Sequence, residues 1–209
     1  MVLTRAARLR LANGIGDVLD TVRTSVGTGT SPTDKKKSTG ITISTWNIVD
    51  GRGNRLKLAC RQLQRLNIDI AFLTETKLNR YHTINSYGYN IVSTKCRHMH
   101  QGGVTLAYKN NKHWHIESPK SFGDNVLKCT LVHGCQRTIL IGIYIPPSED
   151  NMETIKNLDR AVHNVDQKNL VILGDFNINY NQPKDGRAMN IAEAIRTFEL
   201  QDLAKAFKP

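Results

Sequence analysis

Five polar side chains stand at or beside the ends of predicted strands, where a rigid backbone can aim them into a cleft. They are Asn47, Glu75, Tyr144, Asp175 and Asn177. An unpaired carboxylate in an apolar interior costs several kcal/mol, so the two acids must be solvated, paired or bound to a metal ion.

The elements that must position these side chains can be predicted from apolar periodicity. Short alternating or continuous apolar runs predict strands at 41–46, 69–74, 102–108, 126–132, 138–145 and 169–173. Single apolar faces predict helices at 55–66, 151–165 and 187–207. Within 138–145, one face of the strand carries isoleucines and the other carries Leu140, Gly142 and Tyr144.

The order of these elements favours one fold class. Several consecutive strands lie between two helix–strand units, which argues against a regular alternation of parallel strands and helices. We therefore expect two packed sheets with helices on the outside.

Residues 1–40 differ in composition from the rest of the chain. They hold seven basic and three acidic residues, many Thr, Ser and Gly residues, and the run Lys35-Lys36-Lys37. We expect a basic, disordered N-terminal tail here and a folded domain over 41–209. The alternative interpretation is a targeting peptide, because the first acid is Asp17.

Composition narrows the classes of function. The chain of 209 residues has a formal net charge of +11, which favours a polyanionic partner. The longest apolar run, Ile139–Ile145, is too short to span a bilayer, so we expect no membrane insertion. Four cysteines without a CxxC pair and without a secretory leader predict an intracellular, reduced protein that is not secreted.

Five short motifs occur in the order used by the endonuclease/exonuclease/phosphatase family. They are Thr45-Trp46-Asn47, Leu73-Thr74-Glu75-Thr76-Lys77, Gly102-Gly103-Val104, Tyr144-Ile145-Pro146-Pro147 and Gly174-Asp175-Phe176-Asn177. Over about residues 41–205, the chain most closely resembles the apurinic-type endonuclease domain of non-LTR retrotransposons, which is associated with a reverse transcriptase. The resemblance implies an α+β fold, the DNase-I-like four-layer αββα sandwich of two mostly antiparallel sheets.

The resemblance also implies roles for the five polar residues. Glu75 matches a metal-binding glutamate, and Asn47 matches an asparagine that helps hold the metal and the scissile phosphate. Tyr144 matches a tyrosine that binds the phosphate, while Asp175 and Asn177 match the pair that orients the attacking water. The implied reaction is hydrolysis of a DNA phosphodiester with Mg²⁺, or alternatively Mn²⁺, as cofactor.

The sequence departs from the family pattern after Asn177. The family ends with a Ser-Asp-His segment, whereas the last histidine here is His163. We therefore expect a domain that is truncated at its C-terminus and lacks the final strands. Because general acid–base help is worth about 10²–10⁴-fold, the isolated chain is expected to be nearly inactive.

The stretch 76–123 of the expected domain is basic. It holds seven Lys or Arg residues, and we expect Lys77, Arg80, Lys95 and Arg97 to contact nucleic acid. The alternative is a solvated basic surface. Two pairs of histidines, His98 with His100 and His113 with His115, have a spacing that can suit zinc, but four ligands cannot be assembled around them.

Each site residue also has a structural interpretation. Asn47 could form a turn before Gly51, Glu75 could pair with Lys77, Tyr144 could be an edge tyrosine, and 174–177 could be a capped turn.

Other functions stay open beside a DNA-nicking module. One is a phosphoesterase of the same fold acting on an RNA tail, a phosphoinositide or sphingomyelin, and another is an inactive nucleic-acid-binding remnant. We expect a monomer with DNA as its partner and a nuclear location.

Overall fold

The larger of two sheets brings together strands from the first half of the chain. The computed structural model describes residues 19–24, 40–78, 83–96, 102–147, 151–166, 169–178, 183 and 185–198. Six strands form this sheet in the order β1-β2-β3-β6-β5-β4. Their bounds are Leu19–Thr24 (β1), Ile41–Asn47 (β2), Ile70–Thr74 (β3), Thr83–Ser86 (β4), Tyr89–Ser93 (β5) and Val104–Lys109 (β6). Only β2 and β3 pair in parallel, and the other neighbours are antiparallel.

The second sheet has four strands in the order β10-β9-β8-β7. These strands are Trp114–Ser121 (β7), Val126–His133 (β8), Gln136–Tyr144 (β9) and Leu170–Asp175 (β10). Neighbours are antiparallel except β9 and β10, which run in parallel with Tyr144 opposite Asp175. Both sheets therefore combine a parallel pair with antiparallel strands.

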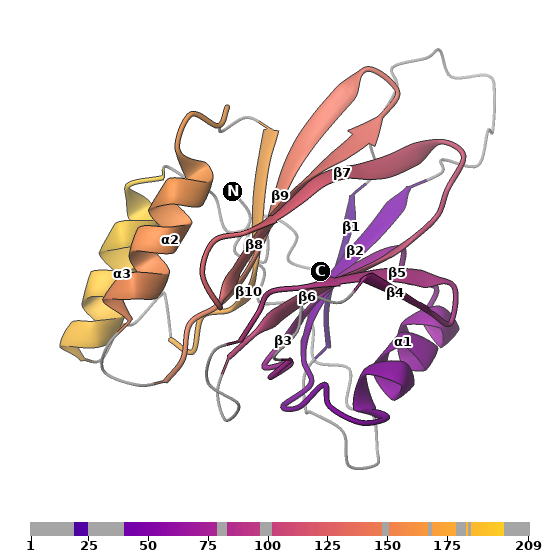
Figure 1. Cartoon of the computed structure of the whole chain (residues 1–209). Coiled ribbons are helices and arrows are strands. Elements are labelled where there is room, and N and C mark those ends of the chain that lie inside the picture. The colour runs from indigo at the N-terminus through magenta and orange to yellow at the C-terminus, as the bar shows by residue number, and fades with distance from the viewer. Residues whose placement is uncertain are drawn as a thin grey trace.

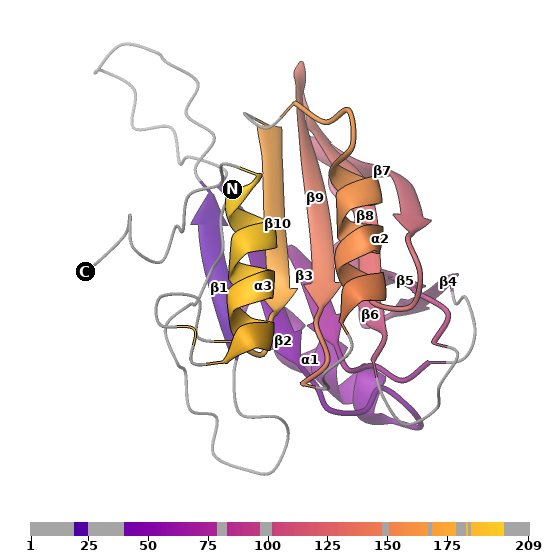
Figure 2. The same ribbon diagram turned by 90° about the vertical axis from the view of Figure 1, so that its left-hand side faces the viewer.

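Three helices cover the outer faces of the two sheets. Helix α1 (Arg55–Arg65) lies on one side of the molecule, and α2 (Met152–Val162) and α3 (Gly186–Arg196) lie on the other, with both sheets between them (Figure 1). Figure 2 shows α2 and α3 in front of the strands of the second sheet. Three apolar cores fill the spaces between these four layers. The predicted four-layer αββα sandwich is thus confirmed.

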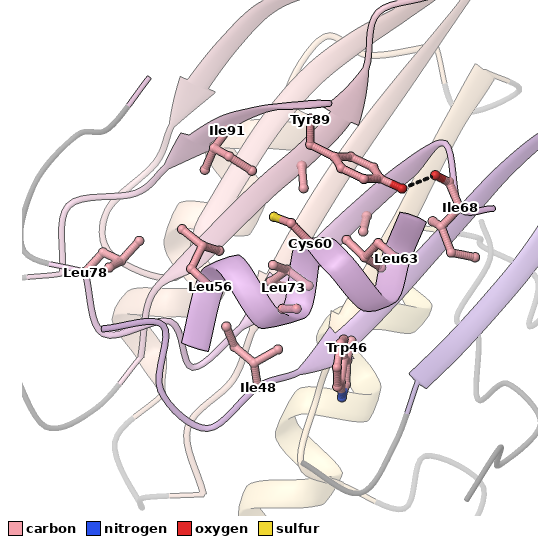
Figure 3. Packing of buried hydrophobic residues seen from close by; sticks show 13 residues of the cluster. Trp46, Ile48, Leu56, Cys60, Leu63, Ile68, Leu73, Leu78, Tyr89 and Ile91 are labelled. Atoms are coloured by element: carbon pink, nitrogen blue, oxygen red, sulfur yellow. Dashed lines mark hydrogen bonds between the residues drawn. The ribbon is translucent and has the colours of Figure 1, made fainter. Parts of the chain in front are cut away.

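Helix α1 packs on the outer face of the first sheet through one apolar stripe. Its buried residues are Leu56, Ala59, Cys60 and Leu63, spaced so that they share one side of the helix. Figure 3 shows this stripe against Trp46 and Ile91 of the sheet. The Tyr89 hydroxyl donates a hydrogen bond to the Ile68 carbonyl in the same core, which satisfies its polar tip.

Strand β9 carries different cores on its two faces, as its alternation predicts. Leu140 and Tyr144 face the core between the sheets, whereas Ile141 and Ile143 face the helices α2 and α3. Gly142 stands opposite the Phe72 ring of the first sheet, and any side chain at this position would overlap that ring. The missing Cβ therefore lets the two sheets approach closely.

Some elements differ from the sequence-based expectation. Strand β1 lies inside the segment expected to be a disordered tail and pairs with β2, so that expectation was wrong for Leu19–Thr24. Strands β4, β5 and β7 were not predicted, and β7 contains a register shift between Glu117 and Lys120 that interrupts its alternation. The predicted helix at 187–207 ends at Arg196, and residues 199–209 lie outside the described part of the chain.

No helix in the described ranges is both long and apolar enough to cross a lipid bilayer.

Candidate functional site

Four strand ends bring the predicted polar residues to one edge of the sandwich. Asn47 is the last residue of β2 and lies beside Thr74, the last residue of β3, which Glu75 follows. Tyr144 and Asp175 are paired at the ends of β9 and β10. Because each of these two pairs is parallel, the carboxyl ends of all four strands can meet at the same edge. The site consequently draws side chains from both sheets.

The side-chain amide of Asn47 joins the two carboxylates. Its Nδ2 donates to Glu75 Oε1 at 2.7 Å and to Asp175 Oδ2 at 2.8 Å. Its Oδ1 accepts from the backbone N–H of Val49 at 2.9 Å, so the turn expected from the structural interpretation is also present. One amide thus holds Glu75 and Asp175 on the same side of the molecule.

Glu75 sits in a tight turn that is fixed by the neighbouring glycine pair. Glu75 and Lys77 both have a positive φ, 54° and 52° respectively. The N–H of Thr76 donates to the carbonyl of Gly103 at 3.3 Å, and that of Lys77 donates to Gly102 at 3.0 Å. Gly103, with φ 89°, leaves no room for a Cβ beside Thr76 Oγ1. The glycine motif therefore shapes the turn that presents Glu75.

Lys77 lies against Glu75 as well as in the expected basic region. Its Nζ is 3.7 Å from Glu75 Oε2, and its side chain is only 15% exposed. The pairing matches the structural interpretation of Glu75. It also places one positive charge among two negative ones.

Tyr144 is almost fully buried, with 3% of its surface exposed. Burial raises its pKa well above the usual value, and the charge of Glu75, a hydrogen bond with Glu75 and the charge of Asp175 raise it further. The hydroxyl is therefore neutral over the physiological range. The edge-tyrosine interpretation is wrong, because Tyr144 belongs to the core between the sheets.

Asp175 and Asn177 form a turn at the end of β10. The N–H of Asn177 donates to Asp175 Oδ1 at 3.1 Å, which is the capped turn of the structural interpretation. Asn177 has φ 48°, and its Nδ2 donates to the Ile145 carbonyl at 3.0 Å. The Asn177 amide thereby ties this turn to the end of β9.

Two residues that hold the site together were missed by the sequence analysis. Arg187 of α3 donates to the Pro146 carbonyl at 2.6 Å and to the Asn177 carbonyl at 3.3 Å. Asn125, before β8, accepts from the N–H of Gly103 through Oδ1 and from that of Tyr144 through its carbonyl, both at 3.0 Å. Neither residue lies in a motif. Both contact backbone groups of the site, so no pattern of residue types predicts them.

Of the other residues expected to contact nucleic acid, only Lys95 lies in the described part of the chain. Lys95 is exposed after β5, whereas Arg80 and Arg97 lie outside the described residues, as do His98 and His100. His115 pairs with Glu117 at 2.9 Å. His115 and His133 lie opposite Val132 and Gln136, at the end of the second sheet remote from Tyr144.

The donor set suits a hard divalent cation. Glu75 and Asp175 offer carboxylate oxygens, and Asn47 offers an amide oxygen if its side chain turns. Within the described ranges, no cluster of three or more His, Cys, Asp or Glu residues could hold a metal ion. Mg²⁺ commonly binds one or two carboxylates and keeps several waters, so two carboxylates are enough for it. Zinc sites usually need more protein ligands, with nitrogen or sulfur among them.

The fold and this site define a two-sheet αββα scaffold with an acidic site at its strand ends. The model of the endonuclease/exonuclease/phosphatase family matches residues 45–196. The chain therefore belongs to the endonuclease/exonuclease/phosphatase family. No curated protein sequence matches it.

The structure is similar to several solved structures. The endonuclease domain of TRAS1, a telomere-specific non-LTR retrotransposon, has a TM-score of 0.58 at 12% identity, covering 75% of this chain and 69% of that domain. A functionally unknown conserved protein from Enterococcus faecalis has a TM-score of 0.53 at 12% identity, covering 74% and 71%. D. rerio TDP2, complexed with a single-strand DNA product, has a TM-score of 0.46 at 16% identity, covering 72% and 64%. At these identities the likeness shows the fold alone.

Proposed function

We propose that the chain hydrolyses phosphodiester bonds of DNA with Mg²⁺ as cofactor, as a nicking endonuclease of a retroelement. The observation that carries the proposal is the Asn47 amide, which holds Glu75 and Asp175 together across two sheets. Two carboxylates fixed side by side cost electrostatic energy that a divalent cation would relieve. Mn²⁺ could replace Mg²⁺ on the same oxygen ligands.

The side chains of the site divide the chemistry between them. When bound at Glu75 and Asn47, the cation would supply charge that stabilises the phosphorane-like transition state. Asp175 has one carboxylate oxygen oriented by the Asn177 N–H and is suited to orient a water and accept its proton. The neutral Tyr144 hydroxyl can donate a hydrogen bond to a phosphate oxygen. Lys77 adds a positive charge next to Glu75, which favours an anionic substrate.

DNA is the favoured substrate for two reasons. The net charge of +11 suits a polyanion, and the fold is shared with the endonuclease domain of TRAS1. The retroelement origin is supported by the five ordered motifs and by the fold shared with the TRAS1 endonuclease domain. With this role we propose a nuclear location.

The test is the nicking of a supercoiled plasmid by the purified chain, with Mg²⁺ and with EDTA, at a chain concentration high enough to detect the low activity expected without the Ser-Asp-His segment. We expect nicking that requires the cation and that falls at least about 100-fold in Glu75→Gln and in Asp175→Asn. Glu153→Gln is the matched control, because Glu153 is an exposed acid on α2. Equal activity of Glu75→Gln and the unchanged chain would remove Glu75 from the mechanism.

Substrate preference is measured beside the plasmid assay. Faster turnover of poly(A) RNA, a soluble inositol phosphate or sphingomyelin would overturn the assignment to DNA. Salt-dependent DNA binding without any hydrolysis, even at high Mg²⁺, would instead identify a nucleic-acid-binding protein that lacks activity.

A further inference from the structure

The outer face of helix α1 carries positive charge only. The helix sequence, RLKLACRQLQR, contains four basic residues and no acid. Lys57, Arg61 and Arg65 are spaced four residues apart, so they form one line along the exposed side, opposite the buried stripe. The packing of α1 on the first sheet explains the apolar stripe but does not explain this line.

The charge pattern works against the stability of the helix. Like charges four residues apart destabilise a helix by a few tenths of a kcal/mol per pair. Arg55 occupies the first turn, where the helix dipole favours an acid, and no acidic residue is present there. A surface helix with no role in binding would gain from a Glu at any of these positions. The pattern therefore points to a use that requires positive charge.

No described acidic residue neutralises this line. Asp50, before the helix, is engaged by Arg52 at 2.8 Å. Asp69, after the helix, accepts from the Thr42 N–H at 2.9 Å and lies 3.6 Å from Lys109 Nζ. Among the described residues, the ion pairs involve neither Lys57 nor Arg61 nor Arg65. The three cations are therefore available to a partner outside the described chain.

We propose that the outer face of α1 binds the phosphate backbone of a nucleic acid, apart from the catalytic centre. Successive cations on the line are about 6 Å apart along the helix axis, which allows contacts to several phosphates of one strand. The side chains are Lys and Arg without an interleaved aromatic ring, which suits backbone contact rather than base stacking. The inference rests on the proposed function, since it supplies a second contact surface for the same substrate.

The position of α1 relative to the site fits this role. Asn47 ends β2, and only residues 48–54 separate it from the first residue of α1. The Gly51 N–H donates to the Thr76 carbonyl at 2.8 Å, so the connecting loop is fastened beside the turn that carries Glu75. From this loop, α1 runs along the outer flank of the first sheet (Figure 1). A strand that leaves the site over the loop can continue along the basic line.

Binding is tested without catalysis, by titrating the purified chain into a short fluorescent DNA duplex in EDTA at several salt concentrations. The variant is Lys57→Gln/Arg61→Gln. Its matched control is Lys156→Gln/Arg160→Gln on α2, which removes the same residue types at the same spacing from an exposed face. Since about 0.9 counterion is released per phosphate contact, the slope of log Kd against log salt should fall by about 1.8 in the α1 variant. The α2 variant should keep the slope of the unchanged chain.

Two outcomes would overturn the inference. An equal loss in both variants would show an effect of net charge, and an unchanged slope in the α1 variant would remove α1 from the interface. Loss of binding to phosphatidylserine vesicles with unchanged DNA binding would assign the face to a membrane surface, which also overturns it. Failure of the α1 result leaves the metal-dependent nicking assay unaffected, so the two proposals fail separately.

A thermal unfolding measurement distinguishes the loss of DNA contacts in the α1 variant from a loss of its fold. Gln has a helix propensity close to that of Lys and Arg, and its introduction removes a like-charge pair. The thermal midpoint of the α1 variant should therefore equal or slightly exceed that of the unchanged chain. A lower midpoint would show that the cations stabilise the fold, which contradicts the argument from unfavourable charge.

Discussion

Asn47 and Asp175 are 128 residues apart in the chain, yet Asn47 Nδ2 lies 2.8 Å from Asp175 Oδ2. Asn47 belongs to the first sheet and Asp175 to the second. Their hydrogen bond therefore crosses between the layers at the edge of the sandwich. The correct packing of the two sheets is a condition for the site to exist.

Replacing Asn47 by Ala should disable the site with little damage to the core. Each hydrogen bond from the amide to a carboxylate is worth about 1.5–3 kcal/mol, and without them Glu75 and Asp175 repel each other. We expect kcat for plasmid nicking to fall about 10²-fold or more. Asn110→Ala, which removes an exposed amide bonded to Asn90, is the control for amide loss. Comparable kcat values in the two variants would contradict the role of Asn47.

Tyr144 should give the fold a distinct pH dependence at alkaline pH. Its pKa in the folded chain lies above the unfolded value of 10.0, because burial and the charge of Glu75 disfavour the phenolate. The stability that this preference contributes is fully present below about pH 10 and is lost as the pH rises further. The free energy of unfolding should thus fall more steeply above pH 10 in the unchanged chain than in Tyr144→Phe, by up to about 1.4 kcal/mol per pH unit.

Urea unfolding at several pH values measures this difference. Tyr87→Phe is the control, because the Tyr87 side chain is 47% exposed. Parallel pH dependences of the unchanged chain and Tyr144→Phe would show that Tyr144 can ionise freely in the fold.

Elements with a clear periodic pattern of apolar residues could be predicted from the sequence. Strand β9 was predicted with both of its faces, since alternation over 138–145 separates the residues of the two cores. Helix α1 was predicted within one residue, from the spacing of its buried stripe. The two acids were singled out because a carboxylate after an apolar run needs solvent, a partner or a metal ion, and all five polar residues were singled out by their strand ends and by motifs that resemble those of the family.

The strands that could not be predicted from the sequence lack a periodic pattern of apolar residues. Strand β7 contains Pro119 and mostly polar residues, and its pairing with β8 shifts between Glu117 and Lys120. Strand β1 has two apolar residues among six, and its stability depends on pairing with β2. Arg187 and Asn125 hold the site by hydrogen bonds to backbone carbonyls and N–H groups. Because every residue has such groups, these contacts cannot be predicted from residue types.

Arg187 is expected to act as a positioning residue for the turn that carries Asp175. Its guanidinium joins the carbonyls of Pro146 and Asn177, a geometry that a Lys side chain cannot reproduce. In Arg187→Lys we expect kcat to fall about 10-fold with little change in KM, since the turn loses its restraint while substrate binding surfaces persist. Steady-state kinetics of plasmid nicking measure kcat and KM separately.

Arg196→Lys, at the other end of α3, is the control for this change. A rise in KM at constant kcat would show that Arg187 binds the substrate directly, and unchanged kinetics would remove it from the site.

Gly142 should set how closely the two sheets approach. Its Cα faces the Phe72 ring, and a Cβ at this position would overlap the ring atoms. Gly142→Ala must force the sheets apart or turn Phe72 from its place, at a cost of about 1–3 kcal/mol. The matched control is Gly186→Ala in the first turn of α3, where a Cβ meets no atom within 4 Å. There the smaller entropy of the unfolded chain should raise the free energy of unfolding by up to about 1 kcal/mol. The urea midpoint should fall in Gly142→Ala and rise in Gly186→Ala.

Gly142→Ala should also lower nicking activity, because the Asn47–Asp175 hydrogen bond crosses between the same two sheets. If Gly142→Ala were as stable and as active as the unchanged chain, Gly142 would not limit the distance between the two sheets.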